Sequence, residues 1–212
     1  MEERVYMHTV NNRYFNSRRD IKVLSSILDS NAILSLRRQG KSHSSSFAGL
    51  DYISLCDYEK RKITNNDLLY YNSFYAYIRH GISLAFDKKT INSIYEVKEP
   101  ILLEALEKSN MIHYYMEMLG NEEKRYTDLP DEVQIKDEVS LDYLSYITYP
   151  CDEFFLSRLF IRHESKEKKL ITELNNLRSV LLWHNKHVNI YDINSGILLD
   201  EQGVEKVLRL NK

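Results

Sequence analysis

The chain has few of the residues that mark metal sites, disulfide frameworks or phosphate-binding loops. Its 212 residues include two cysteines, Cys56 and Cys151, and no CxxC motif, so neither a disulfide framework nor a zinc site is expected. The six glycines form neither a GxGxxG nor a GxxxxGK(S/T) motif, which argues against a Rossmann or P-loop phosphate site. An HExxH motif is absent as well, and we predict no metal site.

Long hydrophobic runs and a strong charge of one sign are also missing. No run reaches the ~18 consecutive apolar residues of a membrane-spanning helix, and the start, MEERVYMHTV, lacks the basic and apolar regions of a signal peptide. The net charge of −2 gives no global attraction to nucleic acid, although a local basic patch stays compatible with it. We therefore expect a soluble, cytoplasmic protein that does not act on membranes, with export independent of a signal peptide left open.

Tyrosine is the abundant residue type, with 16 copies. An AT-rich genome accounts for this together with the many Asn, Lys and Ile residues, and a nucleotide-binding surface is the alternative. A hydrophobic content of 43% and a charged content of 28% are ordinary for a soluble globular protein. The length is sufficient to bury a substantial core.

Hydrophobic periodicity predicts an α+β fold in a single domain over residues 1–212, because helical and strand patterns alternate without a linker or repeat. Helical spacing covers residues 20–29, 66–81, 99–119 and 167–183. A first strand is predicted to end near His8, and further strands cover residues 52–55 and 82–87. Residues 132–150 are predicted to form a strand, a turn and a second strand. Residues 187–200 are predicted to form two strands across a turn. The last helix carries a seam of four leucines, which predicts that the tail completes the same core: Leu170, Leu174, Leu177 and Leu181.

Two local patterns suggest metal binding but are better explained without it. His184 and His187 have the spacing of a helical metal pair, yet they run directly into a strand and lack a third ligand nearby, which favours a surface loop. The segment DINSG at 192–196 resembles a calcium loop without the further acidic ligands and the closing glutamate. A hairpin turn is therefore expected there.

Five short motifs occur in an order that resembles the ADP-ribosyltransferase fold, especially its bacterial members. They span about residues 4–150 and are MHT (7–9), VLSSILDSNAI (23–33), DYISLC (51–56), GISLAFD (81–87) and EVQIKDEVSLDYLSYI (132–147). The resemblance implies a split β-sheet core with interspersed helices. It also implies a NAD-dependent mono-ADP-ribosyltransferase, a glycosyltransferase with NAD as co-substrate, of the toxin or effector type.

The resemblance implies that Glu132 is the catalytic carboxylate. Cleavage of the bond between nicotinamide and ribose passes through an oxocarbenium-like state, which a nearby carboxylate stabilises. Glu132 would bond the nicotinamide-side ribose and steady that positive charge. Glu138, six residues later, is the rival carboxylate, and a solvated position in a polar loop is the alternative for Glu132 itself.

The resemblance further implies a set of NAD-binding residues: His8, Thr9, Arg37, Arg38, Tyr52 and Ser54. His8 would hydrogen-bond the adenine-side ribose, and Thr9 would support backbone contacts nearby. Tyr52 or Ser54 would line the nicotinamide pocket, the tyrosine by stacking on the ring. Arg37, Arg38 or Lys41 would meet the phosphates from the loop at 37–49. The alternative for the three basic residues is a solvated position on the surface. In the strand at 52–55, either Tyr52 with Ser54 or Ile53 with Leu55 must face the core.

Two departures from the family pattern leave the acceptor open. The first motif reads His-Thr rather than His-Gly-Thr, and Pro130 stands two residues before Glu132, where arginine- and asparagine-modifying members carry Glu or Gln. The macromolecular acceptor is thus a protein or a nucleic acid, with a small molecule as a further option. The alternatives are a non-catalytic nucleotide- or protein-binding module on the same fold and a nucleic-acid-modifying transferase.

Overall fold

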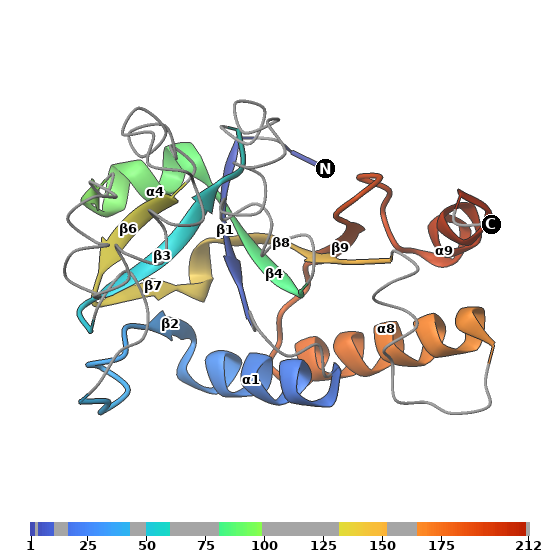
Figure 1. Cartoon of the computed structure of the whole chain (residues 1–212), viewed down its shortest axis with the longest axis horizontal. Helices are drawn as coiled ribbons and strands as arrows, with labels where there is room; N and C mark the ends of the chain where they lie inside the picture. Colours follow the sequence, from blue (N-terminus) through green and yellow to red (C-terminus); the bar gives the residue numbers. More distant parts are fainter. Residues whose placement is uncertain are drawn as a thin grey trace, which may run out of the picture.

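The computed structural model describes residues 1–2, 4–10, 17–42, 50–59, 81–98, 132–151 and 165–210. Its strands are β1 (Val5–Thr9), β2 (Ala32–Leu34), β3 (Tyr52–Asp57), β4 (Ser83–Asp87), β5 (Val97–Lys98), β6 (Glu132–Lys136), β7 (Glu138–Ser140), β8 (Leu144–Tyr149) and β9 (Asn189–Asp192). Its helices are α1 (Ser17–Ser30), α4 (Lys88–Ile94), α8 (Lys166–Trp183), α9 (Glu201–Leu210) and the short 3-10 helix η3 (Leu141–Tyr143). The mixture of helices and strands confirms the predicted α+β class (Figure 1).

A seven-stranded sheet forms the centre of the described fold. Its strand order is β5-β6-β3-β1-β4-β8-β9, and every pair is antiparallel except β8 with β9. Strands β2 and β7 form a separate two-stranded sheet. Between β1 and β3, inside the sheet, only two residue pairs are in register, against five pairs on either side; the edge strand β5 also pairs with β6 over two residue pairs. The ladder that joins β1 to β3 is thus short, although both strands belong to one sheet.

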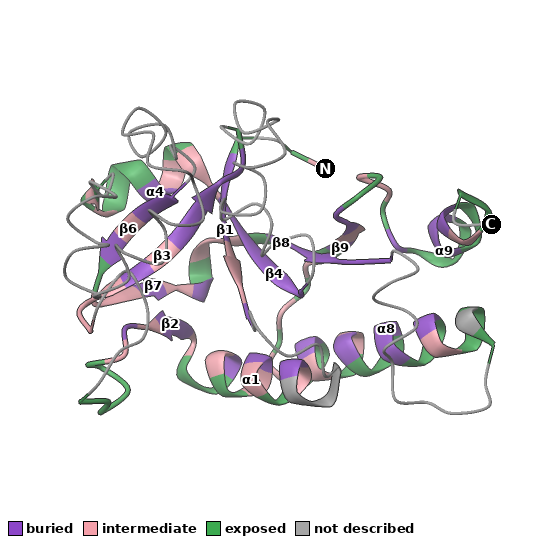
Figure 2. Ribbon diagram, viewed as in Figure 1, coloured by how far each residue is buried: buried purple, intermediate pink, exposed green. Residues whose placement is uncertain are grey.

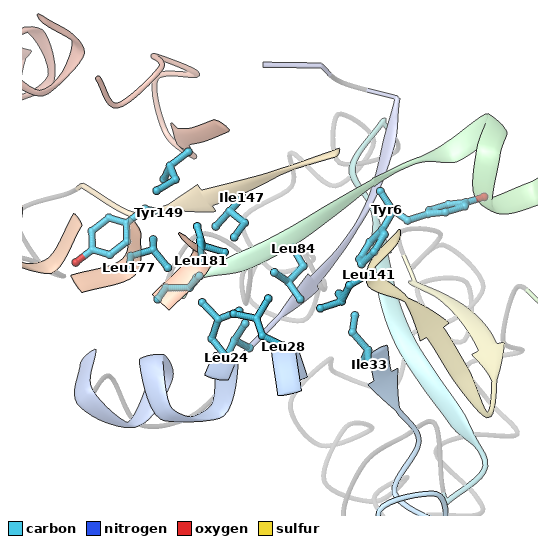
Figure 3. Close-up of a cluster of buried hydrophobic side chains, with 14 of the residues drawn as sticks. Tyr6, Leu24, Leu28, Ile33, Leu84, Leu141, Ile147, Tyr149, Leu177 and Leu181 are labelled. Atoms are coloured by element: carbon cyan, nitrogen blue, oxygen red, sulfur yellow. The ribbon is translucent and has the colours of Figure 1, made fainter. Parts of the chain in front are cut away.

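Helices α1 and α8 lie together along one side of the sheet (Figure 1). The leucine seam of α8 packs against α1 and the strands in one hydrophobic cluster, which includes Leu24, Leu28, Leu84 and Ile147 (Figure 3). Figure 2 shows the same division along α8, with buried residues toward the sheet and exposed residues away from it. The tail therefore contributes to the main core, as its spacing predicts. That the whole chain forms one domain stays a prediction.

A second, smaller cluster lies on the opposite face of the sheet. It contains Val5 and Met7 of β1, Cys56 of β3 and Ala85 of β4, whereas Tyr6 belongs to the main core. Successive side chains of a strand point to opposite faces, so both faces of β1, β3 and β4 are packed. Two-sided burial explains why the apolar residues of these strands do not simply alternate with polar ones.

The predicted boundaries hold to within a few residues where the structure describes them. The helix expected at 20–29 is α1, and the strand expected at 52–55 is β3 with two further residues. Asn31, at a φ of 51°, leads from α1 into β2, and Asp137, at a φ of 65°, forms the turn between β6 and β7. Short polar side chains tolerate this left-handed backbone better than other non-glycine residues. The predicted helices at 66–81 and 99–119 lie outside the described residues.

The carboxyl-terminal segment differs from the prediction of two strands. Strand β9 is followed by the expected turn, but only one isolated bridge, Tyr191 with Leu198, follows it, and then α9 begins. Gly203 explains the close approach of α9 to this turn, since a Cβ atom there would lie 1.7 Å from the Leu198 carbonyl oxygen. Among the described residues, no helix is long and apolar enough to cross a membrane.

The packing of α8 predicts a large difference between two neighbouring positions. Leu174 is 1% exposed and Ile171 is 40% exposed on the same helix. Leu174→Ala should lower the free energy of unfolding by about 2–5 kcal/mol, because it leaves a cavity in the main core. The matched change Ile171→Ala should cost about 0.5 kcal/mol. Chemical denaturation measures both, and equal losses would contradict the placement of the seam in the core.

Candidate functional site

The candidate site lies where β1 and β3 separate. Their pairing ends at Met7 and Cys56, and the next residue of β1, His8, places its Nδ1 3.1 Å from the Ser54 backbone oxygen. The His8 side chain thus makes the hydrogen bond to the Ser54 carbonyl that a backbone N–H would make if the ladder between the strands continued. The sheet opens beyond this point with its strands still joined through the imidazole.

The environment of His8 fixes its protonation state. Burial lowers the pKa of the imidazole below its ordinary 6.5, and the bond to the Ser54 carbonyl raises it by less. The ring is therefore neutral at neutral pH. Because a carbonyl oxygen accepts only, the proton resides on Nδ1, and Nε2 is left as an acceptor. In the described part of the chain, no hydrogen bond to Nε2 is formed.

Glu132 opens β6 and is buried, with 5% of its surface exposed. The Ser54 hydroxyl donates to Glu132 Oε1 at 2.8 Å, and the Gln134 amide donates to the same oxygen at 3.1 Å. Ser54 and Gln134 face each other across β3 and β6 and lie on the same side of the sheet as Glu132. The alternative of a solvated loop carboxylate is therefore wrong.

Three adjacent strands thus bring three of the predicted residues together. Glu132 of β6 contacts the Ser54 side chain, and Ser54 of β3 contacts His8 of β1 through its backbone oxygen. These positions are 46 and 78 residues apart along the chain from Ser54, so only the sheet order joins them.

Thr9 and Tyr52 flank this group and already have partners. Thr9 Oγ1 lies 3.1 Å from Ser83 Oγ of β4. The Lys98 ammonium donates to the Tyr52 hydroxyl at 3.3 Å and lies 5.5 Å from the centre of its ring. The hydrogen bond to Tyr52 raises the pKa of Lys98, with Glu96 adding to the effect. Stacking of another ring on this face of Tyr52 requires Lys98 to move.

Of the two pairs that alternate along β3, Ile53 with Leu55 faces the core and Tyr52 with Ser54 faces away from it. Ile53 and Leu55 are buried in the main cluster, whereas Tyr52 and Ser54 are half-buried.

The two arginines lie in the loop after β2, and each pairs with a carboxylate. Arg37 binds Asp51 through Nε and, at 3.2 Å, through Nη2, and this hydrogen bonding lowers the pKa of Asp51. Arg38 Nη2 donates to Glu138 Oε2 at 3.2 Å on the two-stranded sheet. Glu138, the rival carboxylate, is thus half-exposed and engaged with an arginine, away from Ser54.

Sequence reasoning missed Gln134, Ser83 and Asp51 as partners of the site. Gln134 follows Glu132 by two positions, which in a strand places it on the same face, so its role was recognisable from spacing. Ser83 and Asp51 are found only once the register of β4 and the loop before β3 are known.

The two patterns considered for metal binding lie at the end of α8 and in the turn after β9. His184 ends α8 and His187 is exposed beyond it. The Asp192 carboxylate accepts from the backbone N–H and hydroxyl of Ser195 and so forms the expected turn. Within the described ranges, no cluster of His, Cys, Asp and Glu could hold a metal ion.

Comparison with known proteins gives structural matches alone. No family model and no curated protein matches the sequence. The fold is similar to DarT from Thermus sp. 2.9 in complex with carba-NAD+, at a TM-score of 0.39 and 10% identity, over 84% of this chain and 92% of that one. DarT structures with NAD+ and with ADP-ribosylated single-stranded DNA each match at a TM-score of 0.38 and 9% identity, over 84% of this chain and 91% of theirs. A function for this chain has to rest on its own residues.

The lowered pKa of His8 predicts a specific pH dependence. Below pH 6.5 the unfolded chain binds a proton at this residue before the folded chain does, so acid destabilises the fold. His8→Asn removes the titration but keeps an amide N–H near the Nδ1 position. The stability of the wild type minus that of His8→Asn should be constant above pH 6.5 and fall as the pH drops below it. Chemical denaturation across this range measures the difference, and an increase in acid would show a raised pKa instead.

Proposed function

We propose that the chain is a NAD-dependent mono-ADP-ribosyltransferase of the toxin or effector type, which moves ADP-ribose from NAD to a macromolecular acceptor. The observation that carries the proposal is the linked group of His8, Ser54 and Glu132 at the junction where β1 and β3 separate. It supplies a neutral hydrogen-bond acceptor on β1 and a buried carboxylate on β6, the two strands that flank β3.

Glu132 provides the charge that this reaction needs. Transfer breaks the bond between nicotinamide and ribose, its electron pair leaves with nicotinamide, and the ribose carbon becomes cationic before the acceptor's nucleophile bonds to it and loses a proton. A fixed carboxylate favours that cationic state over the ground state. Ser54 and Gln134 both donate to Oε1, so they hold the carboxylate in place.

His8 supports binding of the dinucleotide. Its Nε2 can accept a hydrogen bond from a ribose hydroxyl, because Nδ1 already donates to Ser54. Thr9 continues the same strand, and its bond to Ser83 fixes the backbone beside His8. Tyr52 lies on the same face as Ser54 and can line the nicotinamide end once Lys98 moves aside.

Arg37 and Arg38 can contact the phosphates without leaving their partners. Arg37 uses Nε and Nη2 for Asp51 and retains Nη1, and Arg38 uses Nη2 for Glu138. A guanidinium carries five N–H donors, so each arginine has donors to spare for an anion.

Nicotinamide release from NAD tests the proposal. The wild type should release nicotinamide, and Glu132→Gln should lower the rate by roughly 10²–10³, the usual cost of removing a charge-stabilising group. The glutamine keeps the size of the side chain and an oxygen that accepts from Ser54 and Gln134, so the thermal midpoint should change little. Glu138→Gln is the matched control and should leave the rate unchanged, because Glu138 pairs with Arg38 at the surface.

Three other outcomes would contradict parts of the proposal. Loss of release in Glu138→Gln alone would transfer the catalytic role to Glu138. NAD binding without release would support a non-catalytic nucleotide-binding module, and absence of both would refute the proposal. Labelled NAD incubated with single-stranded DNA and with proteins of a cell lysate separates the two acceptor classes.

A further inference from the structure

A pocket lies on the face of β3 and β6 that is opposite to Glu132. Its volume is about 360 Å³, and its lining residues are Tyr6, Asp57, Lys88, Asn92, Tyr95, Val97 and Val133. Val133 follows Glu132 in β6 and Asp57 follows Cys56 in β3, so these side chains point away from Glu132 and Ser54. The lining residues belong to β1, β3, β5 and β6 and to α4 with the residues just after it; β1, β3, β6 and α4 can be followed in Figure 1.

The pocket contains a buried acceptor without a donor. Asp57 is 1% exposed, and its Oδ2 accepts from the Lys88 ammonium at 2.7 Å. Its other oxygen, Oδ1, is buried and has no hydrogen-bond partner. A buried carboxylate oxygen usually has at least one donor, since an unsatisfied one costs free energy. A ligand with an N–H or O–H group would satisfy it.

The charges of the pocket already balance, which indicates a neutral ligand. Lys88 pairs with Asp57 and, at 3.3 Å, with Glu59. Arg4 lies 3.7 Å from Glu59 on its outer side. Two cations therefore face two carboxylates. A charged ligand would add a charge without a counterion to this buried group, whereas a neutral donor would keep the charges balanced.

Two other residues of the pocket lining keep hydrogen-bond donors that are not in use. The Tyr95 oxygen accepts from the Ser140 backbone N–H at 3.0 Å, which leaves its hydroxyl hydrogen to donate. Asn92 accepts from Tyr6 through Oδ1 at 3.0 Å, which leaves its amide N–H groups to donate. The remaining walls are two tyrosine rings and two valines, which suit a flat ring.

We propose that this pocket is a second ligand site, which binds a neutral nitrogen heterocycle bearing an exocyclic amine, such as the base of cytidine or adenosine. The amine donates to Asp57 Oδ1, and the adjacent ring nitrogen accepts from Asn92 or Tyr95. Carboxylates accept from the cytosine amine in the same way in protein–DNA contacts. The volume falls at the lower end of small-molecule sites, as a single base requires. None of these contacts depends on the proposed transferase activity.

Binding of cytidine to the full chain, measured by calorimetry and by methyl NMR, tests the site. Cytidine should bind at millimolar concentration and shift the methyl signals of Val97 and Val133, whereas uridine, which lacks the amine, should bind at least tenfold more weakly. Val97→Phe fills the pocket and leaves the Asp57–Lys88 pair intact, so it should abolish binding. Asn92→Ala should weaken binding, and the matched change Ser93→Ala should not, because Ser93 neighbours Asn92 on α4 but does not line the pocket.

The variants separate the pocket from the NAD site. Glu132→Gln should bind cytidine as the wild type does, because Glu132 faces the other side of the sheet. Loss of binding in Glu132→Gln with retention in Val97→Phe would place the ligand in the NAD site and overturn the proposal. Absence of cytidine binding by the folded wild type, or equal binding of uridine, would overturn it as well.

Discussion

The short pairing of β1 with β3 is the constraint on which the candidate site depends. Two residue pairs hold the strands together, and the His8 imidazole then takes over the bond to the Ser54 carbonyl. A longer ladder would close the junction and consume that carbonyl. A shorter one would leave the halves of the sheet joined by side chains alone. The arrangement opens the sheet beside a carboxylate while the flanking five-pair ladders keep both halves rigid.

The second constraint is that successive side chains of a strand point to opposite faces of the sheet. In β3 and β6, one face therefore carries core residues and the other carries the polar group. Ile53, Leu55 and Val133 pack into the main core, and Ser54 and Glu132 face the other way. Because Glu132 is held by two donors on the same face, its charge is compensated despite its burial. The core can therefore be changed on one face with limited effect on the polar group of the other.

Local patterns predicted what depends on neighbours in the sequence. The leucine seam of α8, the inward pair Ile53 and Leu55, and Glu132 in a strand followed from periodicity or motif order. The pairs Arg38–Glu138 and Lys98–Tyr52 join positions 100 and 46 residues apart, and no pattern of spacing fixes such partners. Helix α9 was missed because the strand-like segment before it has a turn and a single bridge instead of a ladder, and Gly203 disguises the helical pattern.

Under the proposed function, Arg37 and Arg38 receive the diphosphate of NAD from carboxylate-paired positions. Arg37 and Arg38 are both more than half exposed, and exposed ion pairs contribute little to stability. Such ion pairs hold the guanidinium groups in a defined direction, and replacing the carboxylate by another anion costs little free energy. A diphosphate brings two negative charges and several acceptor oxygens, so it can add to these contacts or displace a single carboxylate. Under the proposed function, the Asp51 carboxylate, which directly precedes β3, holds Arg37 in place until the diphosphate takes over part of its donors.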